Sequence, residues 1–233
     1  MQQDIGFDII SDLRLNPNDS FNWENKASSL YCILAGNISS NVRTVAQVLA
    51  HLSRYYQGIF YVPGDLEYET TDSIPNRTNE LVMLCGSIPN ICMLHQHVAI
   101  IDGIAIMGVN GWANQNSDNP MEDIIKTAAK LEDLAYLKMT VQKLQRHLDV
   151  KKIIVVTSAV PRTDLFYGEE PSETYDQIPL SAMLTSDTEC KVKHWVFGTY
   201  VKNVDTILDD INYLNNPFIA KSPYWAKRLT VNI

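Results

Sequence analysis

Val62-Pro63-Gly64-Asp65-Leu66-Glu67 is the stretch that decides the fold, because an apolar run ends abruptly there in a polar, glycine-containing turn. The same change recurs four times along the chain. The other turns are Ser11-Asp12-Leu13-Arg14, Ala35-Gly36-Asn37, Thr157-Ser158-Ala159-Val160-Pro161 and Phe197-Gly198-Thr199-Tyr200-Val201. Ligands of α/β sheets bind beyond the carboxyl ends of strands, so we expect the five turns to converge on one face.

The runs before these turns belong to a larger set of short, β-branched segments that alternate with helical patterns, which indicates an α/β layered fold. The expected strands are residues 7–11, 31–35, 59–62, 91–94, 98–101, 104–108, 153–157 and 194–197. Asp102-Gly103 predicts a two-residue hairpin that pairs two of them antiparallel. Residues 206–208 and 211–214 predict a second hairpin and 228–232 a last strand, so the sheets are mixed.

Helical periodicity covers residues 42–56, 79–87 and 120–148. In the longest segment the apolar residues fall three or four apart and form one stripe. The stripe consists of Leu131, Leu134, Leu137, Val141, Leu144 and Leu148. A coiled coil would show this spacing, but a long helix packed on a sheet is favoured, because the stripe runs directly into the strand at Ile153.

Composition excludes several classes of protein. The chain has 233 residues, 45% apolar and 20% charged, as in ordinary globular proteins, and we expect one domain over residues 1–233. A net charge of −8 with scattered basic residues argues against binding to a nucleic-acid backbone. The sequence has no signal-peptide pattern at Met1 and no apolar run long enough to span a bilayer. We expect a cytoplasmic protein without a membrane partner.

The four cysteines, Cys32, Cys85, Cys92 and Cys190, show no C-x-x-C spacing. Neither a zinc knuckle nor a redox motif is therefore supported. We expect reduced thiols that pack as small apolar groups, and no cofactor.

In order and flanking residues, the five turns resemble the fingerprint of the calcineurin-like metallophosphoesterase family. That fingerprint runs D-x-H, G-D, G-N-H-[ED], a histidine after a strand, and G-H-x-H. The resemblance covers nearly the whole chain and implies a four-layer αββα sandwich of two mixed β-sheets flanked by helices. It also implies a site at the turns, where two metal ions about 3.5 to 4 Å apart activate a water and hold a phosphoryl group.

The sequence departs from the family at almost every position that the chemistry needs. Of eight positions that carry metals or protons in the family, only Asp12 is unchanged. The substituted positions are Arg14, Asn37 (for the bridging aspartate), Asp65, Leu66 (for the histidine that protonates the leaving group), Ser158, Thr199 and Val201. Leucine and valine cannot coordinate a metal, and arginine brings a fixed positive charge. We expect a vestigial site without a dinuclear metal centre.

A site without cations would leave Asp12 and Asp65 close together and partly buried, which is costly for carboxylates that have no partner. Arg14 is placed to supply the missing charge, so we expect its guanidinium within about 3 Å of one carboxylate. Arg14→Ala would then cost about 3 to 5 kcal/mol. Two alternatives stay open: Arg14 points into solvent, or it binds an anion.

The function we expect is that of a catalytically inactive metallophosphoesterase-like protein, a pseudoenzyme that acts as a protein-interaction or scaffold subunit. The alternative is a divergent phosphoesterase, or a binder of phosphate ligands, that holds one hard cation at Asp12, Asp65 and Glu67. Aromatic residues that suit a partner surface, unless they close over the protein's own core, are Phe166, Tyr167, Phe218, Tyr224 and Trp225. The partner's identity and the choice between monomer and homo-oligomer stay open.

Overall fold

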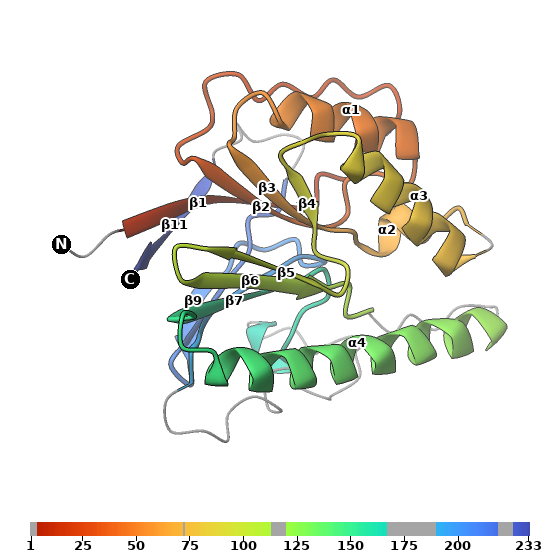
Figure 1. Ribbon diagram of the computed structural model, residues 1–233. Coiled ribbons are helices and arrows are strands. Elements are labelled where there is room, and N and C mark those ends of the chain that lie inside the picture. Colours follow the sequence, from red (N-terminus) through yellow and green to blue (C-terminus); the bar gives the residue numbers. More distant parts are fainter. Residues whose placement is uncertain (1–3, 72, 113–119, 167–189, 219–225) are drawn as a thin grey trace.

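The computed structural model describes residues 4–71, 73–112, 120–166, 190–218 and 226–233. They form two mixed β-sheets with helices on the outer faces, as Figure 1 shows. The predicted α/β fold of two sheets flanked by helices is confirmed. In the described residues no helix is both long and apolar enough to cross a membrane.

The first sheet contains five strands in the order β11-β1-β2-β3-β4. They are β1 (Asp4–Ser11), β2 (Tyr31–Ala35), β3 (Gly58–Val62), β4 (Ile91–Met93) and β11 (Lys227–Asn232). The strands β1 to β4 run parallel, while β11 pairs antiparallel with β1. The carboxyl ends of β1, β2 and β3 therefore lie at one edge of this sheet.

The second sheet contains six strands in the order β5-β6-β7-β8-β10-β9. They are β5 (His97–Ile101), β6 (Ile104–Val109), β7 (Lys152–Thr157), β8 (Val192–Phe197), β9 (Asp205–Leu208) and β10 (Ile211–Leu214). Both predicted hairpins, β5–β6 and β9–β10, are antiparallel. Asp102 and Gly103 have φ angles of 46° and 83°, the positive values that a tight hairpin turn requires.

The two sheets pack face to face over an apolar core. Side chains from both sheets meet in it, including Ile33 and Val62 from the first sheet and Ile106 and Ile154 from the second. All residues of 104–107 and 153–156 have no exposed surface, because these strands are covered by the other sheet on one face and by α4 on the other. The prediction that these two runs are buried is confirmed.

Three helices lie on the outer face of the first sheet: α1 (Val42–Leu52), the single turn α2 (Asp65–Tyr68) and α3 (Ile74–Gly86). α1 ends earlier than predicted, at Leu52. α3 begins five residues earlier than predicted, because the Ser73 hydroxyl accepts a hydrogen bond from the Asn76 amide and Pro75 lies in the first turn, where a proline needs no donor.

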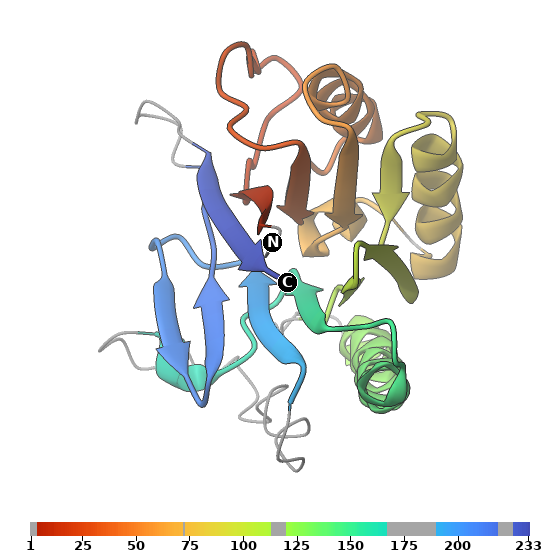
Figure 2. The same ribbon diagram turned by 60° about the vertical axis from the view of Figure 1, so that its left-hand side comes forward.

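The helix α4 (Pro120–Arg146) covers the second sheet, and Figure 2 views it nearly end-on beside that sheet. Leu134, Leu137, Val141 and Leu144 are buried against the strands, as predicted. Leu131 and Leu148, however, are 60% and 86% exposed. A stripe with strict three-or-four spacing drifts around a straight helix, and Leu148 lies beyond the last helical residue. A short 3-10 helix, η1 (Thr163–Leu165), follows β7.

Candidate functional site

The turns after the parallel strands meet at one face of the molecule, as the sequence predicts. The Asp12 amide donates to the Gly36 carbonyl at 3.1 Å, which joins the turns after β1 and β2. The Gly198 amide donates to the Ser158 carbonyl at 3.1 Å, which joins the turns after β8 and β7. The Thr199 amide donates to Asp12 Oδ1 at 3.0 Å and connects the two sheets.

Asp12, Asn37, Ser158 and Thr199 form what we call the strand-end cluster. Asp12 is 2% exposed, and its Oδ1 accepts a 3.0 Å hydrogen bond from Asn37 Nδ2 in addition to that from Thr199. Its other oxygen, Oδ2, is buried without a hydrogen-bond partner among the described residues. Burial raises the pKa of Asp12, against the opposing effects of the Asn37 hydrogen bond and the Arg14 charge.

Asn37 is the centre of the cluster. Its Nδ2 also donates to Thr199 Oγ1 at 3.0 Å, and Ser158 Oγ lies 3.5 Å away. Its Oδ1 accepts a 3.1 Å hydrogen bond from the Leu66 amide, which adds the turn after β3. Both ends of the amide are therefore used within the protein, at the position where the family has its bridging aspartate.

Arg14 pairs with Asp12, as expected, but the ion pair is longer and more exposed than expected. Its Nη2 lies 3.4 Å from Asp12 Oδ1, longer than expected, and its side chain is 49% exposed. The shorter contacts to Asp12 come from Asn37 and Thr199. The expected cost of 3 to 5 kcal/mol for removing Arg14 is therefore too high, because a half-exposed ion pair contributes about 0 to 1 kcal/mol.

Glu67 is a structural carboxylate rather than a cation ligand. It has no exposed surface and accepts hydrogen bonds from the amides of Asn37, Ile38 and Gly64 and from the Tyr61 hydroxyl. Burial raises its pKa to about 7. The carboxylate ties the turns after β2 and β3 together, so the alternative that places Glu67 around a cation is not supported.

The remaining predicted positions are less buried than most of the cluster. Asp65 and Leu66 are half-buried at the start of α2, and Val201 is 61% exposed. The Leu66 backbone amide donates to Asn37 of the cluster. The isobutyl group of Leu66 offers no proton to a leaving group.

The backbone of the site is unusual. Asp12, Arg14, Asn37 and Thr199 have φ angles between 48° and 60°. Aspartate and asparagine tolerate this left-handed region, but a β-branched threonine rarely adopts it. Strained backbone of this kind concentrates at functional sites, so the conformation of these turns marks them as a candidate site.

Two glycines make room for the cluster. A Cβ atom on Gly36 would lie 2.6 Å from Ser158 Oγ, and one on Gly64 would collide with Asn37 Oδ1 and with Ser158 Oγ. The polar side chains therefore occupy the space directly above these turns, and only glycine permits that approach.

The residues present do not fit the two metal ions that the fold implies. The cluster offers one carboxylate, one amide and two hydroxyls, whereas a dinuclear centre needs imidazoles and a bridging carboxylate. The Asn37 amide nitrogen, a donor, contacts Asp12 directly where a shared cation would lie. Across the described ranges no group of three His, Cys, Asp or Glu side chains is arranged to hold a metal.

Two buried residues of the site were not found from the sequence. Asn110 lies directly after β6. Its backbone carbonyl accepts hydrogen bonds from the amides of Ser158 and Ala159, and its side-chain Nδ2 donates to the Pro63 carbonyl at 3.2 Å. Asp133 on α4 accepts the Gly111 amide at 2.9 Å, and burial raises its pKa to about 7. A polar residue directly after an apolar strand was a usable signal for Asn110, whereas nothing in the helical pattern marks Asp133.

The aromatic residues predicted as an interaction surface are divided. Phe166 is 6% exposed and packs edge-on against Tyr200 at 5.2 Å between ring centroids, so it belongs to the core. Phe218 is half-buried against the core around α1. Tyr167, Tyr224 and Trp225 lie outside the described residues.

Sequence comparisons show little. No family model matches the chain. An uncharacterized protein, L509, of Acanthamoeba polyphaga mimivirus is 28% identical over 108 residues. The match covers 44% of this chain and 35% of that protein, so it spans about a third of the relative's length.

Solved structures match over almost the whole chain at low identity. Phosphopantetheinyl hydrolase from Mycobacterium tuberculosis has a TM-score of 0.68 and 14% identity, over 97% of this chain and 96% of that one. A protein described as a putative 5'-nucleotidase from Staphylococcus aureus has a TM-score of 0.57 and 11% identity, over 98% of this chain and 51% of that one. GAP50, the anchor in the inner membrane complex of Plasmodium, has a TM-score of 0.56 and 10% identity, over 92% of this chain and 71% of that one. These likenesses show a phosphoesterase-like fold.

Proposed function

We propose that this chain is a phosphoesterase-fold protein without phosphoesterase activity that serves as a protein-interaction or scaffold subunit, with residues 1–233 as one domain. The observation that carries the proposal is the direct hydrogen bond between Asn37 Nδ2 and Asp12 Oδ1. It joins two positions that hold metal ions in the family. Asp12 Oδ1 and Asn37 Nδ2 are instead hydrogen-bonded to each other and to Thr199.

Loss of activity follows from the chemistry of these side chains. Hydrolysis of a phosphoester in this fold needs cations that activate water and neutralise the charge on phosphorus-bound oxygens. It also needs a proton donor for the leaving group, which typically contributes about 10²- to 10⁴-fold to the rate. Leu66 cannot donate a proton, and the cluster has one carboxylate for both cations.

The scaffold role rests on analogy. The similar structures include a hydrolase and a protein described as an anchor, so one fold serves both kinds of function. A chain that keeps the fold without the catalytic side chains fits the second kind. The partner is a protein, because the charge of −8 disfavours a nucleic-acid backbone.

Two measurements on the purified protein test the proposal. We expect no turnover of bis(p-nitrophenyl) phosphate above a protein-free blank with added Mn²⁺, and no stoichiometric Mn, Fe or Zn by elemental analysis. Arg14→His should not restore activity, because Asn37, Leu66 and Ser158 still differ from the family. Turnover that Asp12→Asn abolishes would overturn the inactivity. Affinity capture from the host would identify the partner, and absence of any specific protein would contradict the scaffold role.

One observation favours a second function. Asp12 Oδ2 is buried without a hydrogen-bond partner among the described residues, and a single hard cation such as Mg²⁺ accepts oxygen ligands of this kind. Ser158 Oγ and Thr199 Oγ1 lie 3.4 Å apart in the same cluster and add neutral oxygens. The alternative is therefore a divergent phosphoesterase, or a binder of a phosphate ligand, with one cation at Asp12 and Asp65.

Calorimetric titration separates the two functions. The scaffold proposal predicts no heat of binding from Mg²⁺ or Mn²⁺ that differs between the wild type and Asp12→Asn. The single-cation function predicts binding at a stoichiometry of one, lost in Asp12→Asn. Glu67 is not a suitable variant, because its carboxylate holds the turns together.

A further inference from the structure

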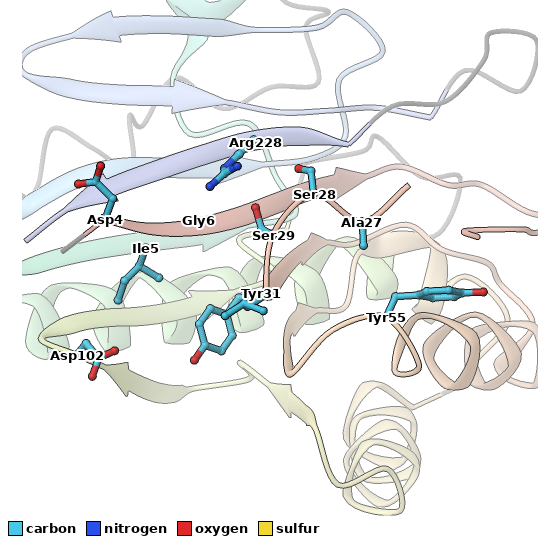
Figure 3. Close-up of a pocket in the computed structure, with 11 residues that line it drawn as sticks. Asp4, Ile5, Gly6, Ala27, Ser28, Ser29, Tyr31, Tyr55, Asp102 and Arg228 are labelled. Carbon is cyan, nitrogen blue, oxygen red and sulfur yellow. The ribbon is translucent and has the colours of Figure 1, made fainter. Parts of the chain in front are cut away.

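A cavity of about 550 Å³ lies at the opposite end of β1 from Asp12. It is lined by the first residues of β1, by the loop that precedes β2 and by Arg228 of β11. We call it the Gly6 pocket, after the residue at its floor. Figure 3 shows Ser29 and Arg228 on one side of it and Tyr31 below them. Its volume is in the range of small-molecule sites.

Three donor atoms converge above Gly6. A Cβ atom on Gly6 would lie 2.9 Å from Ser29 Oγ and 3.1 Å from both Nε and Nη2 of Arg228. Nε and Nη2 form the edge of the guanidinium that binds a carboxylate through two parallel hydrogen bonds. Because Gly6 has no side chain, Ser29 and the exposed Arg228 lie directly against its backbone at the border of the pocket.

These donors have no partner within the part of the chain that the structure describes. Ser29 Oγ is buried and accepts or donates no hydrogen bond there. No ion pair or hydrogen bond joins the Arg228 guanidinium to a described residue. A buried hydroxyl without a partner carries a desolvation cost, and an oxygen ligand placed between Ser29 and Arg228 would remove that cost.

The loop that carries Ser29 is held in place by a buried carboxylate that the strand-end cluster does not use. Asp8, with no exposed surface, accepts the Ser28 amide at 2.7 Å and the Ser28 hydroxyl at 2.5 Å. The Tyr56 hydroxyl donates to Asp8 at 2.9 Å and accepts from Trp23 Nε1 at 2.7 Å. Preorganised donors bind a ligand more tightly, because less ordering is needed on binding.

The rest of the lining determines the kind of ligand. Ile5, Leu30 and the rings of Tyr31 and Tyr55 provide apolar surface. The charged residues are one arginine, Arg228, and the two acidic residues that Figure 3 shows toward the other end, Asp4 and Asp102. A dianion would be repelled by these carboxylates, so a single negative charge suits the pocket better.

We propose that the Gly6 pocket binds a small monoanionic carboxylate with an apolar or aromatic body. The carboxylate is held by the Arg228 guanidinium and by the Ser29 hydroxyl. The apolar body lies against Tyr31 and Leu30. This site is separate from the strand-end cluster and does not depend on the function proposed for that cluster.

Nuclear magnetic resonance with ¹⁵N-labelled protein tests the proposal, with sodium 2-naphthoate as the probe. We expect saturable shifts of the amide signals of Gly6, Ser29 and Tyr31. Arg228→Gln should weaken binding by about tenfold or more and Ser29→Ala by about threefold, since the first removes charge-assisted hydrogen bonds and the second one neutral donor. Arg43→Gln, an exposed arginine on α1, is the matched control and should bind as the wild type does.

Phenyl phosphate, a dianion at pH 8, is the second probe and is compared with the monoanion 2-naphthoate. At pH 8 we expect it to bind more weakly than 2-naphthoate. The proposal is overturned if 2-naphthoate produces no shifts at these amides or if Arg228→Gln binds it as well as the wild type. Tighter binding of phenyl phosphate would contradict the selection for a monoanion. The spectrum of each variant without ligand shows that it is folded.

Discussion

The two ends of the first sheet differ in how their polar groups are satisfied. At the carboxyl ends of the strands, Asn37 uses both ends of its amide on neighbouring turns and closes the strand-end cluster. At the opposite end, Ser29 and Arg228 face a cavity without partners in the described chain. At the strand-end cluster only Asp12 Oδ2, an acceptor, lacks a partner in the described chain, whereas the opposite end has donors without partners there.

Replacement of Asn37 should lower the stability of the protein most, because it disrupts the strand-end cluster. Asn37→Leu removes one hydrogen bond to Asp12 Oδ1 and leaves the Leu66 amide without its acceptor, and unsatisfied buried groups cost about 1 to 3 kcal/mol each. We expect a loss of about 3 kcal/mol in unfolding free energy, measured by urea denaturation. Asn25→Leu is the control, because Asn25 is exposed and has a similar φ of 57°. Equal losses in the two variants would show that backbone conformation, not the cluster, is responsible.

The buried carboxyl beside the strand-end face should give the next largest effect. Burial raises the pKa of Asp133 from 3.8 to about 7, so the folded state binds this proton more tightly than the unfolded state does. The group therefore costs stability progressively as pH rises from about 4 to about 7. Asp133→Asn keeps an acceptor for the Gly111 amide and removes the charge.

At pH 8 we expect Asp133→Asn to be more stable than the wild type by on the order of 2 kcal/mol. The difference should shrink toward zero at pH 4. Urea denaturation at several pH values measures it, with the exposed neighbour Glu132→Gln as the control. A variant that is less stable than the wild type at pH 8 would show that the hydrogen bond to Gly111 needs the carboxylate.

Replacement of Arg14 should change the stability only slightly, because this side chain lies at the exposed border of the strand-end cluster. Arg14→Ala is expected to change the unfolding free energy by less than about 1 kcal/mol. Arg14→Gly should be at least as stable as Arg14→Ala, because glycine adopts the observed φ of 48° without strain. A loss of several kcal/mol in Arg14→Ala would restore the arginine-for-metal interpretation.

The smallest effects are expected from two hydroxyls, one in the strand-end cluster and one in the Gly6 pocket. Thr199→Val removes the acceptor of a 3.0 Å hydrogen bond from Asn37 and should cost about 1 kcal/mol. Ser29→Ala removes a hydroxyl without a partner in the described chain and should change the thermal midpoint by less than a degree or raise it. A larger loss for Ser29→Ala than for Thr199→Val would reverse the comparison.

Local patterns predicted most of the fold. The turn Asp102-Gly103 determines its own hairpin, and strands buried on both faces read as continuous apolar runs. The error at Leu131 has a physical cause, because helical spacing alone does not say which residues the sheet covers. Boundaries such as the start of α3 depended on a cap at Ser73 that the apolar pattern does not contain.

The sequence predicted where the site lies but not which side chains contact one another in it. Convergence of Asp12, Asn37, Ser158 and Thr199 follows from parallel strands that end at one edge. Which of several donors approaches Asp12 most closely depends on turns far apart in sequence, so Arg14 was favoured over Asn37. The roles of Glu67 and Asn110 as supports for the turns likewise depend on contacts across strands.

A crystal structure of the protein soaked in MnCl₂, with anomalous data, tests the central claim most directly. We predict no anomalous peak within about 3 Å of Asp12 Oδ2, beyond the distance at which oxygen binds such cations. Asn37 Nδ2 should remain in hydrogen-bond contact with Asp12 Oδ1. A full-occupancy manganese ion bound to Asp12, with the Asn37 amide turned to present its oxygen, would contradict the account.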